Sequence, residues 1–362
     1  RRPPTVFSAG ACRSFMAVDV FVVVSGFVTH WSYGPRLLCG SISLRQFYVR
    51  RLANIILTTY CAMISSLLVV VAVPEFRSKF MPSGWTLVGC FGFVVHWVNP
   101  EAWCPAPPSW TIEALLPSWL LYPLTCKALD HVETRSGALG LLVAMLALWA
   151  ISFGPVLTVF VVQGFRLSWA QYATDFLWPP AQLADFIIGA AAAAIAFRHG
   201  SDDKERDGPD SEGPQVAPCC RAWPSWRALV ADASFVVVAT AVLLAPPPQK
   251  HSECQTDWNA LFSHGWALAI ALFLYCSAPA GQGGLVAQLL RHRALVALGA
   301  YSFEAYLFQW SLVAIFHSAS GQWPLSPEVF MAFLLALWLV AGLYVECVAT
   351  PLTRSLRSAL KA

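Results

Sequence analysis

Apolar runs of close to 20 residues recur along almost the whole chain, and they restrict its possible folds more than any other feature. A helix needs about 20 apolar residues to cross the hydrocarbon core of a bilayer. The predicted spans are 15–33, 52–73, 110–129, 137–163, 176–197, 229–245, 261–278, 294–316 and 329–350. These nine runs predict an all-α, polytopic bundle of transmembrane helices in a multi-pass integral membrane protein.

The composition excludes several other classes. Only 12% of the 362 residues are charged, whereas 57% are hydrophobic, and a soluble domain carries about 25% charged residues. A nucleic-acid-binding protein, a disordered tail and a secreted disulfide mini-domain are therefore excluded. The cysteines and histidines show no spacing typical of a metal site, so we expect neither a metal nor a bound cofactor.

Lys and Arg are distributed unevenly between the predicted loops. Sixteen lie in loops on one side and four in loops on the other, and the richer side is predicted to be cytoplasmic. This bias holds only if the short apolar run 85–98 does not span, so we expect a re-entrant or interfacial segment there. Arg1, Arg2 and Arg13 fall on the other side. Because the sequence also starts without Met, we expect one more helix upstream of Arg1.

One polar stretch interrupts the pattern. Residues 199–226 are rich in charge and proline, and they predict a cytoplasmic linker within a single membrane domain, 1–362. On the opposite side, Cys104 and Cys254 fall in predicted outer loops, where they could pair. Which membrane holds the chain, and its oligomeric state, are left open.

Six ionisable residues fall inside the apolar runs, where each costs several kcal/mol and is a functional candidate by default. They are Asp19, Glu113, Asp185, Asp232, Glu304 and Glu346. Asp232 and Glu346 lie near span ends, so the alternative is that they reach the interface. His30 and His317 are predicted near opposite membrane faces. His96 and His264 are expected to be hydrogen-bonded structural histidines.

Several motifs follow one another in a specific order. Residues 16–27 contain VD-x-F-x-x-x-SGF, residues 47–53 read F-x-x-RR-L-A, and residues 110–123 carry a characteristic Trp-to-Pro spacing. Later segments, 180–192 (PAQLADFIIGAAA) and 298–310 (LGAYSFEAYLFQW), agree as well. Together these pieces resemble the acyltransferase-3 family of integral-membrane O-acyltransferases.

The resemblance implies transfer of an acyl group, expected to be acetyl, from cytosolic acyl-CoA to a hydroxyl of a carbohydrate or lipid acceptor. Acyl-CoA is then a co-substrate, and membrane lipid is the other partner. Arg50 and Arg51 are expected to hold the donor, because guanidinium groups match phosphate oxygens. The cavity is expected to involve these residues: Ser25, Gly26, Trp110, Tyr301, Ser302 and Gln309. The small Ser25 and Gly26 allow another helix or a ligand to approach closely.

The chain departs from the family pattern at positions that matter for chemistry. The family histidine is expected upstream of Arg1, so the catalytic candidates within the chain are Asp19, Glu113 and Glu304. Asn54 and Gln309 replace a family Arg and His, respectively. Leu115 occupies the position of a frequent Glu, and Glu113 is displaced by two positions, which turns it roughly 200° around a helix. The alternative is a non-catalytic relative or a small-molecule transporter.

Overall fold

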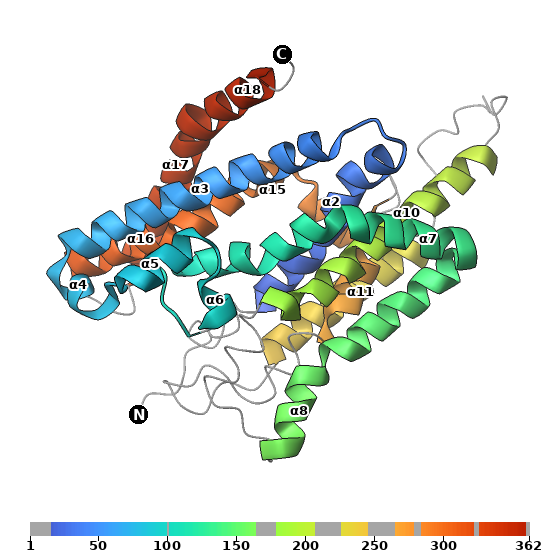
Figure 1. The fold of residues 1–362 in the computed structure, drawn as a ribbon, viewed down its shortest axis with the longest axis horizontal. Coiled ribbons are helices and arrows are strands. Elements are labelled where there is room, and N and C mark those ends of the chain that lie inside the picture. The colour runs from blue at the N-terminus through green and yellow to red at the C-terminus, as the bar shows by residue number, and fades with distance from the viewer. Residues whose placement is uncertain are drawn as a thin grey trace. The chain divides into compact units, whose positions relative to one another are not determined.

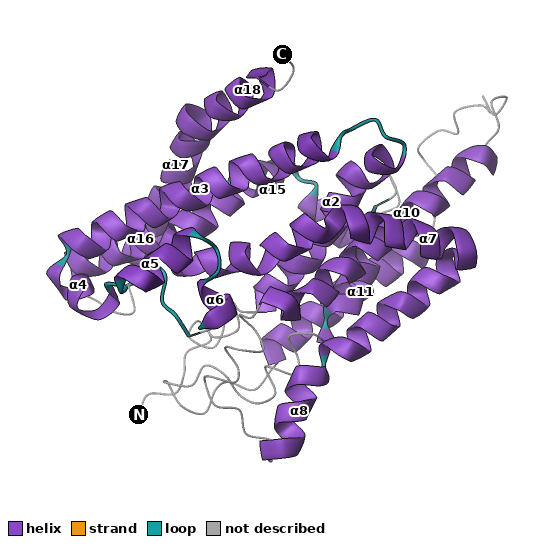
Figure 2. Ribbon diagram, viewed as in Figure 1, coloured by secondary structure: helices purple, strands orange, loops and turns teal. Residues whose placement is uncertain are grey.

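The computed structural model describes residues 16–99, 101–163, 179–206, 226–244, 265–278, 284–321 and 326–359. Throughout these ranges the regular structure is helical and contains no strand (Figure 2). The α-helices are α2 (Met16–Leu38), α3 (Leu44–Ala72), α4 (Pro74–Phe80), α5 (Gly84–Phe91), α6 (Val95–Val98), α7 (Trp110–Ser152), α8 (Gly154–Gln163), α10 (Leu183–Arg206), α11 (Trp226–Leu244), α13 (Ala267–Ser277), α14 (Leu285–Leu290), α15 (Arg293–Ala300), α16 (Ser302–Ser320), α17 (Pro327–Tyr344) and α18 (Thr350–Ala359). Short 3₁₀ turns η1 (Pro107–Ser109) and η2 (Pro179–Gln182) and a π-helical segment η3 (Val345–Ala349) complete the list.

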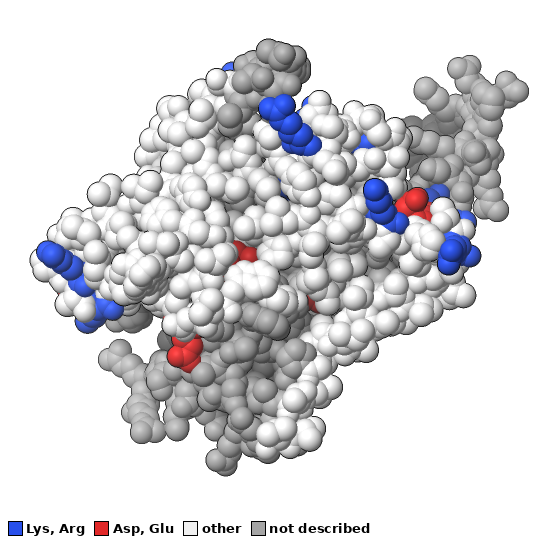
Figure 3. Space-filling view, viewed as in Figure 1, with Lys and Arg blue, Asp and Glu red and all other residues white. Residues whose placement is uncertain are grey.

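Three of these helical stretches are long and apolar enough to cross a membrane. They are Leu44–Ala72, Pro107–Ser152 and Pro327–Ser355, and α13 is a shorter apolar helix. Large apolar side chains remain exposed on them, for example Leu68 at 65% and Leu335 at 70%. Charged side chains are sparse on the face drawn in Figure 3, where they lie in small groups separated by uncharged surface. The all-helical membrane fold is confirmed, and the count of nine spans stays a prediction.

α7 contains two of the predicted spans in one continuous element. Gly137 interrupts it with φ 62° and ψ −158°, a conformation that costs glycine little and other residues much. The chain reverses there, so that the two halves of α7 run in opposite directions (Figure 1). The predicted separation of 110–129 from 137–163 is thereby confirmed.

The short run 85–98 forms two helices instead of one. α5 ends at Phe91, and α6 occupies only Val95–Val98. Between them Phe93 has φ 56°, which is rare for a bulky side chain. Neither helix approaches the length needed to cross a bilayer. The prediction that this run is not a continuous span is confirmed.

One predicted span was wrong. The span 294–316 is broken at Tyr301, whose φ of −110° and ψ of 3° separate α15 from α16. The span 329–350 lies within the helical stretch Pro327–Ser355, which passes from α17 into the π-helical segment η3. The polar stretch that begins at His199 starts as a continuation of α10 to Arg206. Its remainder, 207–225, lies outside the described residues, as does His264.

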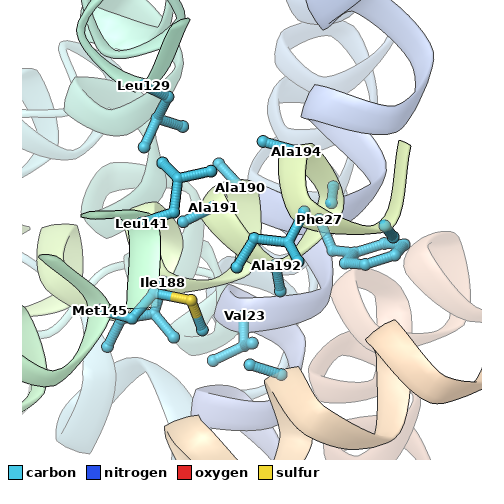
Figure 4. Packing of buried hydrophobic residues seen from close by; sticks show 14 of the residues in the cluster. Val23, Phe27, Leu129, Leu141, Met145, Ile188, Ala190, Ala191, Ala192 and Ala194 are labelled. Atoms are coloured by element: carbon cyan, nitrogen blue, oxygen red, sulfur yellow. The ribbon is translucent and has the colours of Figure 1, made fainter. Parts of the chain in front are cut away.

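The chain divides into two compact units, each described here by itself. Unit 1 comprises Arg1–Ser41, Leu121–Phe176 and Pro180–Arg291. Its core is formed where α2, α10 and α13 pack together with the later part of α7 (Figure 4). The alanines of α10, from Ala190 to Ala196, are buried almost completely. Small side chains allow helix backbones to approach closely, which is how helices associate in lipid.

Unit 2 comprises Ile42–Leu120, Leu177–Pro179 and His292–Ala362. Here α3 packs on α16, and α16 packs on α17. A disulfide joins Cys90 of α5 to Cys104 of the segment before η1. The pairing of Cys104 with Cys254, which the sequence left open, is excluded because Cys104 is bonded to Cys90. Cys90 lies within the apolar run 85–98, and its Cα is 5.7 Å from that of Cys104 in the folded chain.

Candidate functional site

One face of α3 carries polar side chains along an otherwise apolar helix. Arg51, Asn54, Thr58 and Ser65 follow spacings of three, four and seven residues, which place them on one side of a helix. Ser43 and Gln46 form a capping box at the start of α3, which fixes where the helix begins. The polar face of α3 is turned toward α16 and α17 within unit 2.

These polar side chains pair with partners on the two neighbouring helices. Asn54 lies within hydrogen-bonding reach of Glu304 in α16. The Tyr344 hydroxyl of α17 donates to Thr58 Oγ1 at 3.3 Å. We define the polar seam of unit 2 as Asn54, Thr58, Ser65 and Ser66 of α3, Glu304 and Ser311 of α16, and Tyr344 of α17.

The far half of the seam is a hydroxyl cluster. Ser311 Oγ lies 2.7 Å from Ser66 Oγ and 3.2 Å from Ser65 Oγ. Ser66 and Thr58 are completely buried, and Glu304 is 4% exposed. Buried ionisable and polar groups in a membrane helix bundle commonly mark a path for polar substrates. Of the three catalytic candidates, the structure places Glu304 in this seam.

The two arginines at the start of the seam differ in environment. Arg50 is exposed. Arg51 is partly buried, and its guanidinium lies 5.1 Å from the ring centroid of Trp119 in a cation–π contact. Tyr48 links the start of α3 to α7, because its hydroxyl donates to the Leu120 carbonyl oxygen at 2.8 Å. Consecutive helical residues point about 100° apart, so the side chains of Arg50 and Arg51 leave α3 in different directions.

A cavity of about 260 Å³ lies beyond the other end of α3. Its walls come from α4 and α16: Glu75, Phe76, Lys79, Phe80, Trp310, Val313 and His317. Glu75 and Lys79 form an ion pair at 3.2 Å on the exposed side. The indole Nε1 of Trp310 is buried and has no hydrogen-bond partner among the described residues. Trp103 packs against the same aromatic residues. Its ring centroid lies 5.4 Å from that of Phe80 and 5.5 Å from that of Trp310.

His96 and Glu113 form a buried pair that the sequence did not connect. Glu113 Oε2 lies 2.7 Å from His96 Nδ1, and Oε1 accepts the His96 backbone N–H at 2.7 Å. The two residues are 3% and 2% exposed. The family pattern has a frequent Glu at the position of Leu115, whereas this chain has its carboxylate at Glu113. At that position the carboxylate reaches His96 of α6. The expectation that His96 is hydrogen-bonded is confirmed.

Four of the predicted cavity residues lie in unit 2. The Tyr301 hydroxyl donates to Glu346 Oε1 at 3.3 Å, and the exposed Ser302 donates to the Gly299 carbonyl oxygen. Trp110 is buried as the first residue of α7. Gln309 is partly buried beside Trp310 in α16. Tyr301 and Ser302 lie where α15 meets α16, and their partners, Glu346 of η3 and the Gly299 carbonyl, do not belong to the polar seam.

The remaining candidates belong to unit 1. Asp19 and Asp185 are buried, at 1% and 0% exposure, on α2 and α10. Ser25 is buried in α2, and its carbonyl oxygen accepts the Thr29 hydroxyl. At Gly26 the close neighbour is the backbone of α10, so the glycine serves a helix crossing. Unit 1 thus holds Asp19, whereas unit 2 holds Glu113 and Glu304.

Two other histidines have defined partners. Inside unit 1, Nδ1 of His30 forms a hydrogen bond with the Tyr122 hydroxyl, 3.1 Å away. His317 lines the cavity of unit 2 and meets the Phe76 ring edge-on. The described residues contain no group of three or more His, Cys, Asp or Glu arranged to hold a metal.

Sequence reasoning missed the seam partners and the cavity. The spacing of Asn54, Thr58 and Ser65 was a usable signal, since polar residues on one face of an apolar helix indicate an internal surface. The contact of Thr58 with Tyr344 joins residues 286 positions apart, and no local pattern reports it.

Comparison with known proteins decides the family. A model of the acyltransferase-3 family, described as an acyltransferase domain, matches residues 6–345. The chain belongs to the acyltransferase-3 family. This membership confirms the resemblance seen in the motifs. The chain is an acyltransferase that transfers a group other than an aminoacyl group, and members of this family are membrane proteins.

Among curated relatives, the chain is similar to acyltransferase MdmB of Streptomyces mycarofaciens. The two are 24% identical over 352 residues, which cover 90% of this chain and 77% of that protein. No solved structure matches the chain.

Proposed function

We propose that this acyltransferase-3 protein moves an acyl group, expected to be acetyl, from cytosolic acyl-CoA to a hydroxyl of a carbohydrate or lipid acceptor. The polar seam of unit 2 carries the proposal. A thioester donor bears amides and a carbonyl oxygen that need hydrogen-bonding partners in an apolar surrounding. The seam supplies such partners along α3, from the end that carries Arg50 toward the end that adjoins the cavity.

We assign the donor phosphates to the end of α3 that carries Arg50 and Arg51. Arg50 is exposed and free to meet phosphate oxygens. Arg51 is held over Trp119, so its charge stays near the entrance of the seam. The excess of Lys and Arg in loops on this side agrees with a cytosolic donor.

The acceptor is assigned to the cavity between α4 and α16. A volume of about 260 Å³ lies below the roughly 300–1,000 Å³ of pockets for drug-sized ligands. Aromatic walls beside the Glu75–Lys79 ion pair suit a ligand with one apolar face and several hydroxyls. These features favour a carbohydrate ring over a long lipid chain.

A binding experiment tests the donor assignment. The full chain in liposomes is titrated with acetyl-CoA, and the variant Arg50→Ala with Arg51→Lys is compared with wild type. Loss of charged hydrogen bonds worth about 1.5–3 kcal/mol should weaken binding about 10- to 100-fold. Arg45→Ala is the matched control, because Arg45 is an exposed arginine of the same helix end. Equal affinity in the double variant and wild type would remove the donor role.

A turnover experiment separates the two classes of function. Release of free CoA thiol is followed with acetyl-CoA and methyl α-glucoside as the probe acceptor. Thiol release that depends on methyl α-glucoside supports acyl transfer. Entry of labelled methyl α-glucoside into sealed vesicles without thiol release would instead favour a transporter.

A further inference from the structure

The chain between α4 and η1 includes a long stretch without charge. Residues 80–100 contain no Asp, Glu, Lys or Arg. They connect two stretches, Leu44–Ala72 and Pro107–Ser152, that are each long and apolar enough to cross a membrane. The helices α4, α5 and α6 in between have 7, 8 and 4 residues, too few to cross it. In a membrane protein this part of the chain therefore leaves and re-enters the bilayer on the same face.

The exposed side chains of α5 and α6 are large and apolar. Trp85 and Val88 lie three positions apart on one side of α5, and they are 87% and 65% exposed. Val98 of α6 is 87% exposed. We define the docking surface as these residues and the exposed apolar residues near them: Met81, Trp85, Val88, Val94, Trp97 and Val98. We propose that the docking surface inserts into the boundary between lipid headgroups and acyl chains.

Position and residue type identify lipid as the occupant of this surface. Clusters of exposed apolar side chains mark interaction sites, and this cluster lies between two stretches of the chain that can cross a membrane. The docking surface carries two tryptophans, Trp85 and Trp97. Tryptophan is enriched at membrane–water interfaces, where its ring meets the acyl chains and its N–H stays close to water.

The depth of insertion follows from the backbone and from the neighbouring charges. The first four N–H groups and the last four C=O groups of a helix have no partner within it. Helices as short as α5 and α6 leave many such groups, and the hydrocarbon core offers no water to satisfy them. Exposed charged residues, Lys79 and Glu101, bound the uncharged stretch at its two ends. The segment therefore lies along the interface and does not enter the core as a re-entrant segment.

The opposite side of the segment is packed within unit 2. Tyr60 of α3 stacks on Phe93, with ring centroids 5.4 Å apart. Glu113 of α7 accepts the backbone N–H of His96 at 2.7 Å. A disulfide holds Cys90, the penultimate residue of α5. The docking surface thus rests on a fixed support, so little conformational freedom is lost when it meets lipid.

Two observations assign the docking surface to the extracytoplasmic leaflet. The Cys90–Cys104 disulfide lies within the same segment, and disulfides persist in oxidising compartments. The loop that contains the segment is also on the predicted side with few Lys and Arg residues.

Depth-dependent fluorescence quenching tests the proposal. Val88→Cys in the full chain is labelled with an NBD iodoacetamide and reconstituted into phosphatidylcholine vesicles. The vesicles contain a doxyl quencher either near the headgroup or near the end of the acyl chain. The shallow quencher should cause the greater loss of fluorescence. Arg77→Cys, on an exposed position of α4, is the matched control and should be quenched less by either lipid. Wild type treated in the same way supplies the background from native thiols.

Each alternative location gives a different result. Stronger quenching by the deep quencher would indicate a re-entrant segment. An unquenched label that emits as in water would place the surface in solvent. A label with blue-shifted emission but no quenching would place it against protein, such as a second copy of this chain. Each of these three results would overturn the proposal.

A measurement on the wild type covers the case in which the labelled variant does not fold. Phosphatidylcholine with a photoactivatable diazirine beside the glycerol backbone is incorporated into the vesicles, and peptide mass spectrometry locates the lipid adducts after illumination. Adducts on peptides that contain Trp85 or Trp97 support the proposal. Recovery of these peptides without adducts, while peptides of α3 carry them, overturns it.

Discussion

The carbonyl oxygen of Phe186 in α10 lies directly against Gly26 in α2, where a Cβ would overlap it. The reciprocal contact occurs one turn away, because a Cβ on Gly189 of α10 would overlap the carbonyl oxygen of Val23. Two glycines on facing helices thus bring the backbones of α2 and α10 together. Such close crossings are a principal source of helix association in lipid.

Gly26→Ala should therefore destabilise unit 1. The new methyl group meets backbone, which cannot rotate away, so the two helices must separate, at a cost of about 1–3 kcal/mol. Thermal unfolding in detergent should show the loss. Gly342→Ala in α17 is the control, since nothing lies within 4 Å of its Cβ position, and it should be neutral or slightly stabilising. Equal melting temperatures for Gly26→Ala and wild type would contradict the observed crossing.

Asp232 has a structural role that its position near a span end did not reveal. Its carboxylate accepts the backbone N–H groups of Leu285 at 2.8 Å and Val286 at 2.9 Å, at the first turn of α14. Gly284, the residue before this helix, supplies no side-chain cap of its own. Asp232 of α11 therefore caps α14 from outside the helix.

Removing this cap should loosen α14. Asp232→Ala should cost about 0.5–2 kcal/mol, as for other lost helix caps. Asp232→Asn should cost less, because one oxygen acceptor remains. Amide hydrogen exchange at Leu285 and Val286 should accelerate in the order wild type, Asn, Ala. An unchanged exchange rate in Asp232→Ala would show that other groups satisfy these donors.

The sequence predicted features that depend on local pattern. The apolar runs predicted a helical membrane fold, and the small size of Gly26 predicted a close approach. It did not predict whether a helix or a ligand approaches Gly26, because the neighbour comes from α10. Nor did it predict the break at Tyr301, since apolar residues on both sides continue the helical pattern. The motif order nevertheless identified the family.

The candidate site was less accessible to sequence reasoning. The sequence singled out Asp19, Glu113 and Glu304 only because an ionisable side chain is costly inside an apolar helix. This argument does not say which of the three lie in the same unit. His96 was expected to be hydrogen-bonded, but its partner, Glu113, lies 17 positions away and was not identified. Contacts of this kind are set by tertiary packing. A spacing rule cannot supply them.

The Cys90–Cys104 disulfide can be checked chemically. Closing a loop of about 15 residues stabilises a chain by about 3 kcal/mol in the chain-entropy view, and the separation here is 14. Cys104→Ser and Cys90→Ser should each lower stability by a comparable amount, and the double variant should match either single one. Alkylation before reduction should leave both cysteines unlabelled in the wild type. Labelled Cys90 in unreduced protein would contradict the bond. A disulfide also requires an oxidising compartment, which agrees with the predicted extracytoplasmic side.

Cys39 offers a test of orientation. It is exposed in the turn after α2, on the side predicted to be cytoplasmic, and a hydrogen bond with Ser41 lowers the pKa of its thiol. A lowered pKa leaves more thiolate at neutral pH, and the thiolate is the reactive form. A membrane-impermeant maleimide should label Cys39 in inside-out vesicles and spare it in right-side-out ones.

The pH dependence of this labelling has a definite sign. As pH falls, wild-type Cys39 should keep its reactivity to a lower pH than the same thiol in Ser41→Ala, which has lost the hydrogen bond that favours the thiolate. Cys39→Ser identifies the labelled peptide by its absence. Labelling from the opposite side would show that the Lys and Arg bias does not set the orientation, and the assignment of Arg50 to a cytosolic donor would lose its topological support.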